Sequence, residues 1–375
     1  MVDYMKYYSK TYEESRQAFH EAVNNYKNAW NDVRIWDQEV VENRFIDFAR
    51  FNSTVKNNLL CITSGLHGIE GYVGAAVINF FVDQFKDIIS PEDTSVLLIH
   101  GINPYGMARY ERNNENNVDL NRNFVRSWDN ITPNKAYMSA RDYFESTTVL
   151  GDPLFNKIDF FFTTLGQLIR TKPKKFKEAL LSGQYSSPDG LYYGGNGYER
   201  STEVMIELFK NLFEEDYNKM VFIDLHTGYG PKDKMLIVNS ALEKHSSSKL
   251  KSLFSYPDVR KTDKEEFYSI NGDMIDYLYH LKRIHVPEKS FYACSFEFGT
   301  YGDDLGGLLK SLRNTINARK IKKGLVSPNI LEHYKAEYTQ MFYPSDHLWR
   351  VDALKHSEKA LKGIFKAFNY IKEDD

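Results

Sequence analysis

The sequence predicts an α/β fold built on a doubly wound, mostly parallel sheet. Residues 59–62 and 96–99 are short runs of large apolar residues, which are typical of buried strands. Between them, residues 71–87 carry apolar side chains at helical spacing with few helix breakers. A strand, a helix and a strand at this spacing indicate a right-handed parallel crossover. Strand-like runs at 220–225 and 293–298 extend the same pattern.

The chain is predicted to begin with a helix over residues 11–29. Thr11 and Glu14 match a capping box, and apolar residues follow at helical spacing. After the first crossover, residues 109–124 are polar and rich in asparagine, which predicts a structured loop and not a helix.

Residues 127–200 interrupt the alternation of strands and helices. They contain a helical pattern at 155–169, a basic stretch at 170–177 and a Gly/Tyr/Ser-rich loop at 183–197. A basic stretch of this kind is usually a solvated helix face. We interpret the segment as a helical and loop insertion that covers one edge of the sheet and forms part of the active-site rim.

The second half of the chain returns to the α/β pattern. A further strand is predicted at 235–238, and helices are predicted at 203–213, 271–281, 305–321 and 351–371. The sequence shows no internal repeat, low-complexity tract or flexible linker. We therefore expect residues 1–375 to form a single domain.

Composition narrows the class of protein. The formal charge of −3 argues against a general nucleic-acid binder, which is usually basic. The sequence has no apolar run of 18 or more residues, and its start lacks the apolar core of a signal peptide, so we expect a cytoplasmic protein with no membrane partner. Cys61 and Cys294 lie in apolar strand-like runs and are expected to be buried thiols.

The turn at residues 64–71 carries the first candidate metal ligands. His67 and Glu70 follow the strand at 59–62, at the sheet edge where ligands bind in open α/β folds. His226 likewise ends the strand at 220–225, so the three side chains can meet. Two histidines and one glutamate form a catalytic zinc set, which predicts one zinc ion per chain. Asp224 would orient a ligand from behind.

Three charged residues are candidates for the chemistry beside the metal. Glu297 ends another strand, and a free carboxylate beside a metal is what general-base hydrolysis requires. Arg112 and Arg122 lie in the polar loop, where one cation could hold a substrate carboxylate and the other an oxyanion. Two alternatives stay open: Glu297 as a structural partner of Arg109 or Arg112, and Arg109 in place of Arg112.

The order of these residues resembles that of the zinc carboxypeptidases related to carboxypeptidase A, in a bacterial branch of that superfamily. The shared pattern is His67-x-x-Glu70, Asn121-Arg122, His226 and Glu297, with the loops Asn103-Pro104-x-Gly106 and Asp119–Phe124. The resemblance covers residues 55–305 apart from the insertion. It implies a three-layer α/β/α sandwich around a mixed, mostly parallel sheet of eight strands.

The resemblance also implies roles for individual residues. The zinc ligands would be His67, Glu70 and His226. Glu297 would be the general base, and Arg112 would stabilise the oxyanion. Asn121 and Arg122 would hold the terminal carboxylate of the substrate. Tyr268 is the candidate for the family's substrate-capping tyrosine, with Tyr256 and Tyr277 as rivals.

The expected function is that of a zinc-dependent, metallocarboxypeptidase-like hydrolase that cleaves an amide bond next to a free carboxylate. One alternative is an N-acyl-amino-acid deacylase resembling aspartoacylase and succinylglutamate desuccinylase, which share the His-Gly-x-Glu turn and the Asn-Arg pair. A second alternative is a catalytically inactive, ligand-binding relative. The expected partner is a small peptide or an acylated amino acid, and the oligomeric state stays open.

Overall fold

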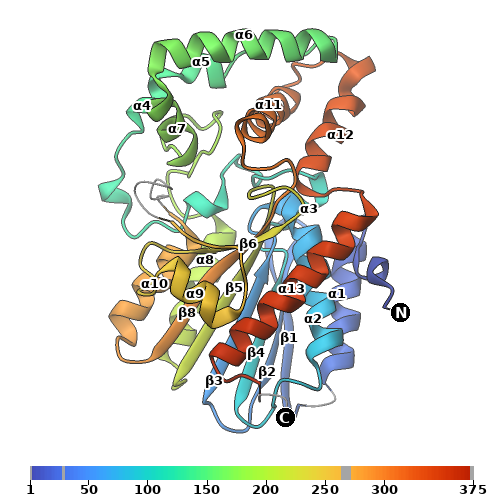
Figure 1. The fold of residues 1–375 in the computed structure, drawn as a ribbon, viewed down its shortest axis with the longest axis vertical. Helices are drawn as coiled ribbons and strands as arrows, with labels where there is room; N and C mark the ends of the chain where they lie inside the picture. The colour runs from blue at the N-terminus through green and yellow to red at the C-terminus, as the bar shows by residue number, and fades with distance from the viewer. Residues whose placement is uncertain (1, 28–29, 263–271, 372–375) are drawn as a thin grey trace.

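A mixed sheet lies at the centre of the protein (Figure 1). A computed structural model describes residues 2–27, 30–262 and 272–371. Within these residues eight strands pair in the order β1-β2-β4-β3-β5-β8-β6-β7. The strands are β1 (Asp32–Val41), β2 (Arg44–Asn52), β3 (Asn58–Ser64), β4 (Thr94–His100), β5 (Lys219–Thr227), β6 (Met235–Asn239), β7 (Val259–Lys261) and β8 (Ser290–Phe298).

The four central strands are parallel to one another. β4, β3, β5 and β8 pair in this order, and the predicted crossover through α2 (Gly71–Phe85) joins β3 to β4. β3 and β4 are buried along their whole length, as their aliphatic runs predict for strands covered on both faces. Because the strands are parallel, the segments that follow β3, β5 and β8 leave the sheet at the same edge.

Most pairings outside the four central strands are antiparallel, apart from the parallel pair of β6 and β7, and these strands were harder to predict. β1 and β2 form a hairpin that pairs with β4 through β2, and the sequence analysis did not predict it. β1 is an edge strand without a fully buried residue, and it carries charged side chains such as Arg34 and Asp37. Its pattern therefore lacks the apolar alternation of a half-buried strand. On the other side, β6 runs antiparallel to β8.

Helices cover both faces of the sheet, so the predicted α/β/α sandwich is confirmed. One face packs against α1 (Tyr12–Tyr26), α2, α9 (Ser247–Phe254) and α13 (His347–Ala367). The other packs against α8 (Arg200–Glu214) and α10 (Met274–His285). The predicted cap of α1 forms, since the Thr11 side chain accepts a hydrogen bond from the Glu14 amide at 3.1 Å.

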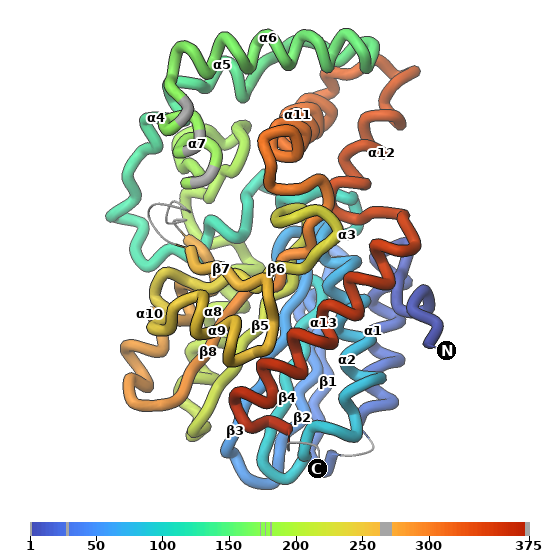
Figure 2. The backbone as a smooth tube through the Cα atoms, viewed as in Figure 1, coloured from blue at the N-terminus to red at the C-terminus, as the bar shows by residue number. Residues whose placement is uncertain are grey.

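The helices of the 127–200 segment lie beyond the carboxyl ends of the central strands (Figure 2). They are α4 (Lys135–Ser139), α5 (Arg141–Phe144), α6 (Pro153–Thr171) and α7 (Pro173–Leu181). Their small core includes Tyr137 and Phe144 and is shared with Leu312 and Ile316 of α11 (Leu305–Lys322). These helices therefore pack on α11, and the expectation that they cover a sheet edge was wrong.

The remaining elements are short or differ from prediction at their ends. The sequence analysis missed β7, α9 and α12 (Leu331–Phe342). Short helical segments occur at α3 (Pro104–Arg109), Tyr4–Tyr7, Gly68–Glu70, Leu120–Arg122, Trp128–Asn130 and Pro328–Ile330. Cys61 and Cys294 are buried and free, as expected. Among the described residues, no helix combines the length and apolar character that crossing a membrane requires.

Candidate metal centre

The turn after β3 places His67 and Glu70 at the carboxyl edge of the sheet. Gly65 has a φ of +75°, a backbone conformation that favours glycine. A Cβ atom on Gly68 would lie 2.2 Å from the backbone of Gly106, so the turn can pack closely on the loop after β4 only with glycine here. Both His67 and Glu70 are buried, and Glu70 directly precedes α2.

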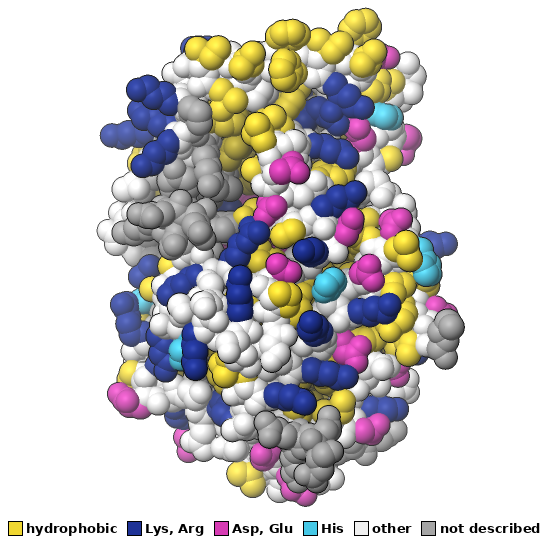
Figure 3. Space-filling model, in the orientation of Figure 1, with side chains coloured by type: hydrophobic (Ala, Val, Ile, Leu, Met, Phe, Trp, Pro, Cys, Tyr) yellow, Lys and Arg dark blue, Asp and Glu magenta, His cyan; other side chains and the backbone are white. Residues whose placement is uncertain are grey.

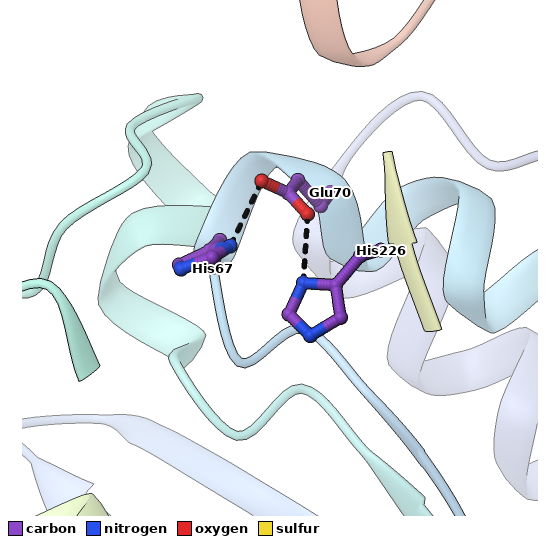
Figure 4. Close-up of side chains that lie close together, drawn as sticks. All are labelled: His67, Glu70 and His226. Carbon is purple, nitrogen blue, oxygen red and sulfur yellow. Dashed lines mark hydrogen bonds and ion pairs between the residues drawn. The ribbon is translucent and has the colours of Figure 1, made fainter. Parts of the chain in front are cut away.

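His226 comes to the same point from the end of β5. Its Nδ1 atom lies 3.1 Å from Oε2 of Glu70, and Nδ1 of His67 lies 2.9 Å from Oε1 of Glu70 (Figure 4). The ligand atoms of the three buried residues lie within 4.8 Å of one another. The structure therefore brings together the three residues that the sequence predicted as metal ligands.

Each histidine contacts an aspartate through Nε2, the ring nitrogen that does not face Glu70. Nε2 of His67 lies 2.9 Å from Oδ1 of Asp119, and Nε2 of His226 lies 2.6 Å from Oδ2 of Asp224. Thr63 donates a hydrogen bond to the other oxygen of Asp224 at 2.5 Å. In the neutral tautomer that suits metal binding, the ring proton of each histidine lies on Nε2, where the aspartate accepts it, and Nδ1 faces Glu70. The predicted position of Asp224 is confirmed.

This proton assignment leaves a position suited to a cation. Among the described residues, none forms a hydrogen bond with the buried Nδ1 of His67. Nδ1 of His67 and of His226 then present lone pairs to the Glu70 carboxylate, which also carries only lone pairs. A metal ion between these atoms would turn a repulsive contact into coordination. Two imidazole nitrogens and a carboxylate oxygen suit zinc, so the residues fit the predicted metal.

The close packing of these charged groups also shifts the pKa values of His226 and Glu70. Burial opposes protonation of His226, but Asp224 and Glu70 outweigh burial and raise the pKa of its imidazole well above the usual value. Burial likewise disfavours the charged form of Glu70, yet the neighbouring His67, His226 and Arg112 lower the pKa of its carboxyl group. Without a metal, the site therefore favours a second ring proton on His226, at Nδ1 beside Glu70, and a divalent cation would displace this proton.

Arg112 reaches the cluster because its backbone is fixed to the turn. Its carbonyl oxygen accepts a hydrogen bond from the Gly68 amide at 3.1 Å. Its guanidinium donates to Oε1 of Glu70 at 3.0 Å and to Oδ2 of Asp119 at 3.2 and 3.3 Å. Nη2 also lies 2.8 Å from Nε2 of His67. Asp119 contacts both groups, His67 through Oδ1 and Arg112 through Oδ2.

Glu297 extends from the strand beside His226. The two residues are register partners in the parallel pair of β5 and β8, so their side chains project from the same face of the sheet. The pKa of the Glu297 carboxyl group is raised to about 8, mainly by burial; His226 opposes this rise and Glu70 contributes to it. The backbone of Gly299, two residues further along the chain, packs against Pro231, and a Cβ atom there would lie 2.0 Å from the Pro231 carbonyl oxygen.

Asn121 and Arg122 lie beside Asp119, but their immediate contacts are within the protein. The Asn121 amide donates to Asp273 at 3.1 Å and accepts from the Met274 backbone at 3.0 Å, which ties it to the start of α10. Arg122 is only 6% exposed. Its side chain packs so closely on Gly183 that a Cβ atom there would lie 2.7 Å from its Cδ.

The three candidate tyrosines do not complete the site in the described residues. Tyr268 lies outside the described ranges. Tyr256 is buried, and its hydroxyl donates to the Met235 carbonyl at 2.9 Å. Tyr277 is also buried, and its ring packs near Phe124. Neither rival is among the residues that contact the three candidate ligands.

The loop at 183–197 reaches the site, whereas α4–α7 lie farther away. The Tyr193 carbonyl accepts a hydrogen bond from the Asp119 amide at 2.7 Å, and the Tyr185 hydroxyl donates to the Arg122 carbonyl at 2.6 Å. A cavity of about 940 Å³ adjoins Arg112 and is lined by Tyr192 of this loop and by Tyr338 of α12, among others. Within the described part of the 127–200 segment, these contacts connect the loop at 183–197 to the predicted site.

Comparisons with known proteins identify the family. The family described as "Protein of unknown function (DUF2817)" matches residues 8–356. The chain belongs to this family. Among proteins with curated descriptions, none matches the sequence of this DUF2817 chain.

Several solved structures resemble the DUF2817 chain at low identity. Bovine thrombin-activatable fibrinolysis inhibitor, in complex with tick carboxypeptidase inhibitor, is 15% identical, with a TM-score of 0.48 over 85% of this chain and 97% of that one. Carboxypeptidase A from Helicoverpa armigera is 14% identical, with a TM-score of 0.47 over 88% and 73%. Succinylglutamate desuccinylase from Chromobacterium violaceum is 12% identical, with a TM-score of 0.37 over 79% and 73%. Both kinds of enzyme that the sequence motifs resemble are thus among the similar structures.

Sequence reasoning about this DUF2817 chain missed residues that only the fold brings to the site. Asp119 was recognised as part of a motif but given no role, although it binds both His67 and Arg112. Tyr338 lies beside Arg112, but it belongs to α12, which was not predicted. Asp119 follows the asparagine-rich loop directly, and its neighbour Asn121 was singled out. The acidic side chain of Asp119, two residues before Asn121, was the sequence feature that could have indicated its role.

Proposed function

We propose that the chain is a zinc-dependent hydrolase that cleaves an amide bond next to a free carboxylate. The observation that carries this proposal is the arrangement of His67, Glu70 and His226, three buried residues whose ligand atoms lie within 4.8 Å of one another. Zinc bound there would activate water and polarise the substrate carbonyl. The remaining steps depend on residues of the chain itself.

Glu297 is the proposed general base. Its side chain projects from the same face of the sheet as His226. Its pKa is raised to about 8, mainly by burial, which is close to neutral pH. A carboxylate in this position can remove a proton from water and pass it to the leaving nitrogen. Arg112 is fixed by Asp119 and Glu70, so its guanidinium is oriented before substrate binds and can stabilise the developing oxyanion.

Arg122 is the proposed anchor of the substrate carboxylate, through a two-pronged contact. Its surroundings favour a short substrate, because Gly183 and Tyr185 pack directly against it. This confinement supports the deacylase alternative, in which the substrate is a small N-acylated amino acid. A carboxypeptidase-like activity would then be limited to short peptides.

Activity measurements can separate these possibilities. The zinc-loaded protein would be incubated with a panel of dipeptides and N-acyl amino acids, and the release of free amino acids would be measured. Release from either group, lost in His226→Ala but kept in the exposed control His347→Ala, is the expected result. The group that is cleaved identifies the substrate class. A fully zinc-loaded protein that releases nothing from either group would contradict the proposal and favour a ligand-binding role.

A further inference from the structure

The helix α6 presents its most apolar face away from its own chain. Seven large apolar side chains on this face are between 45% and 75% exposed: Leu154, Phe155, Ile158, Phe161, Phe162, Leu165 and Ile169. At 3.6 residues per turn they fall within about a third of the helix circumference. In the space-filling view, hydrophobic side chains gather at this end of the molecule (Figure 3). We call these seven residues the α6 stripe.

The inward face of α6 is the more polar one. Thr164 and Gln167 are its buried residues, and Phe160 packs against the small core shared with α11. An amphipathic helix of a globular protein normally turns its apolar stripe to the core. The reversed orientation indicates that the α6 stripe is covered by something outside the chain.

Charged residues lie at the two ends of α6 with opposite signs. Asp152 caps the amino end and is exposed, with its side chain accepting hydrogen bonds from the Leu154 and Phe155 amides. At the carboxyl end, Arg170 and Lys172 are exposed, and the sequence continues with more lysines. Two antiparallel helices also attract through their dipoles, because the partially positive amino end of each helix then faces the partially negative carboxyl end of the other.

We propose that the α6 stripe is a self-association surface, and that two copies of the chain pair through antiparallel α6 helices. The apolar positions are compatible with a two-fold axis between Phe161 and Phe162. In that register Leu154 meets Ile169 of the second copy, and Ile158 meets Leu165. The same surface then serves both partners, as a two-fold dimer requires.

This register also pairs the charges. Asp152 of one copy lies opposite the segment between Arg170 and Lys172 of the other, and the contact occurs twice by symmetry. A parallel pair would instead place both basic ends together. The uneven charge also favours a second copy over an anionic lipid surface. A membrane-surface helix carries lysines and arginines along its polar face, whereas the amino-terminal half of α6 is capped by Asp152 and carries Asp159 together with Lys157.

Light scattering during size-exclusion chromatography of the full chain tests the surface. We expect a dimer for the unchanged protein at micromolar concentration and a monomer for the double variant Phe161→Asp/Phe162→Asp. The control is Leu348→Asp, which places the same charge at a 70% exposed leucine on α13, outside the stripe. This control should remain dimeric. Circular dichroism should show the same helical content in all three proteins.

A charge variant tests the antiparallel register. Lys172→Asp should raise the dimer dissociation constant about 5- to 30-fold, the scale of two exposed ion pairs. Adding Asp152→Asn, which keeps a good helix cap, should restore part of the affinity, because it removes the new repulsion without replacing the lost ion pairs. The proposal would be overturned if the unchanged protein were a monomer. It would also be overturned if the Phe161→Asp/Phe162→Asp variant still formed the dimer. A monomer that sediments with phosphatidylglycerol vesicles through the stripe would assign the surface to lipid and overturn it as well.

Discussion

Asp224 and His226 are in contact through Oδ2 and Nε2 at 2.6 Å, two residues apart on β5. When Asp224 accepts the one ring proton of neutral His226 from Nε2, the lone pair of Nδ1 faces Glu70. The carboxylate thereby selects the ring nitrogen that a metal would bind. The alternation of side chains along a strand is enough to create this pair.

The first prediction concerns this orienting contact. Asp224→Ala should weaken zinc binding about 10- to 100-fold, because the His226 ring loses the partner that fixes its tautomer. Affinity would be measured by competition with a chromophoric chelator. Asp216→Ala removes an exposed aspartate near the opposite end of β5 and should leave zinc affinity unchanged. Equal affinities for Asp224→Ala and the unchanged protein would show that the contact does not orient the ligand.

The second prediction concerns Glu297. Glu297→Gln keeps the size and hydrogen-bonding capacity of the side chain but removes its basicity. We expect the variant to fold and to retain zinc, while turnover falls about 100-fold or more. Comparison of turnover in zinc-matched preparations provides the measurement. Near-normal turnover would remove Glu297 from the mechanism and direct attention to Glu115, in the loop beside Lys322, or to Glu265, which lies outside the described residues.

The third prediction is that zinc affinity rises with pH through the neutral range. Asp224 and Glu70 raise the pKa of His226 in the metal-free protein, so a bound proton must leave when the metal enters. One displaced proton corresponds to about a tenfold change in affinity per pH unit. Zinc dissociation constants at pH 6, 7 and 8, in a buffer that does not bind metal, give the slope. A flat profile would mean that no proton is displaced over this range.

The fourth prediction concerns stability at a distance from the site. Asp47 is fully buried and contacts Arg16, His20 and His100. Burial disfavours its charge, but these partners outweigh burial and lower its pKa well below the usual value. A lowered folded-state pKa stabilises the protein above the unfolded pKa of about 4, and this stabilisation is lost as the pH falls further.

Asp47→Asn should therefore lower the free energy of unfolding by about 3 kcal/mol at pH 7, the scale of a broken buried ion pair. The difference from the unchanged protein should narrow below about pH 4. Urea unfolding at several pH values measures both. The control is Asp37→Asn, an exposed aspartate that shares Arg16 and should have little effect. A difference that stays constant down to pH 3 would contradict the assigned role.

The metal ligands could be predicted from sequence because each is tied to a strong local pattern. His67, Glu70, His226 and Glu297 all follow or end buried apolar strands, and parallel strands bring such ends together. Asp119 could not be assigned in this way. Its contact with His67 depends on how a loop of irregular conformation folds back on the turn at 64–71, which no periodicity encodes.

The fold shows the same division between local pattern and context. The buried strands β3 and β4 were predictable from aliphatic runs, whereas the β1–β2 hairpin was not, because charged residues occupy its exposed edge strand. The helical pattern of α6 was also found from sequence. Its apolar stripe could not be assigned a direction, since spacing alone does not tell which face of a helix meets the core.

Metal analysis of purified protein tests the central claim most directly. We predict one zinc ion per chain for the unchanged protein and for His347→Ala, a control at an exposed histidine. His226→Ala should lose the metal, because two remaining ligands do not complete a zinc site. Full zinc occupancy in a folded His226→Ala protein, or none in the unchanged protein supplied with zinc, would contradict the account.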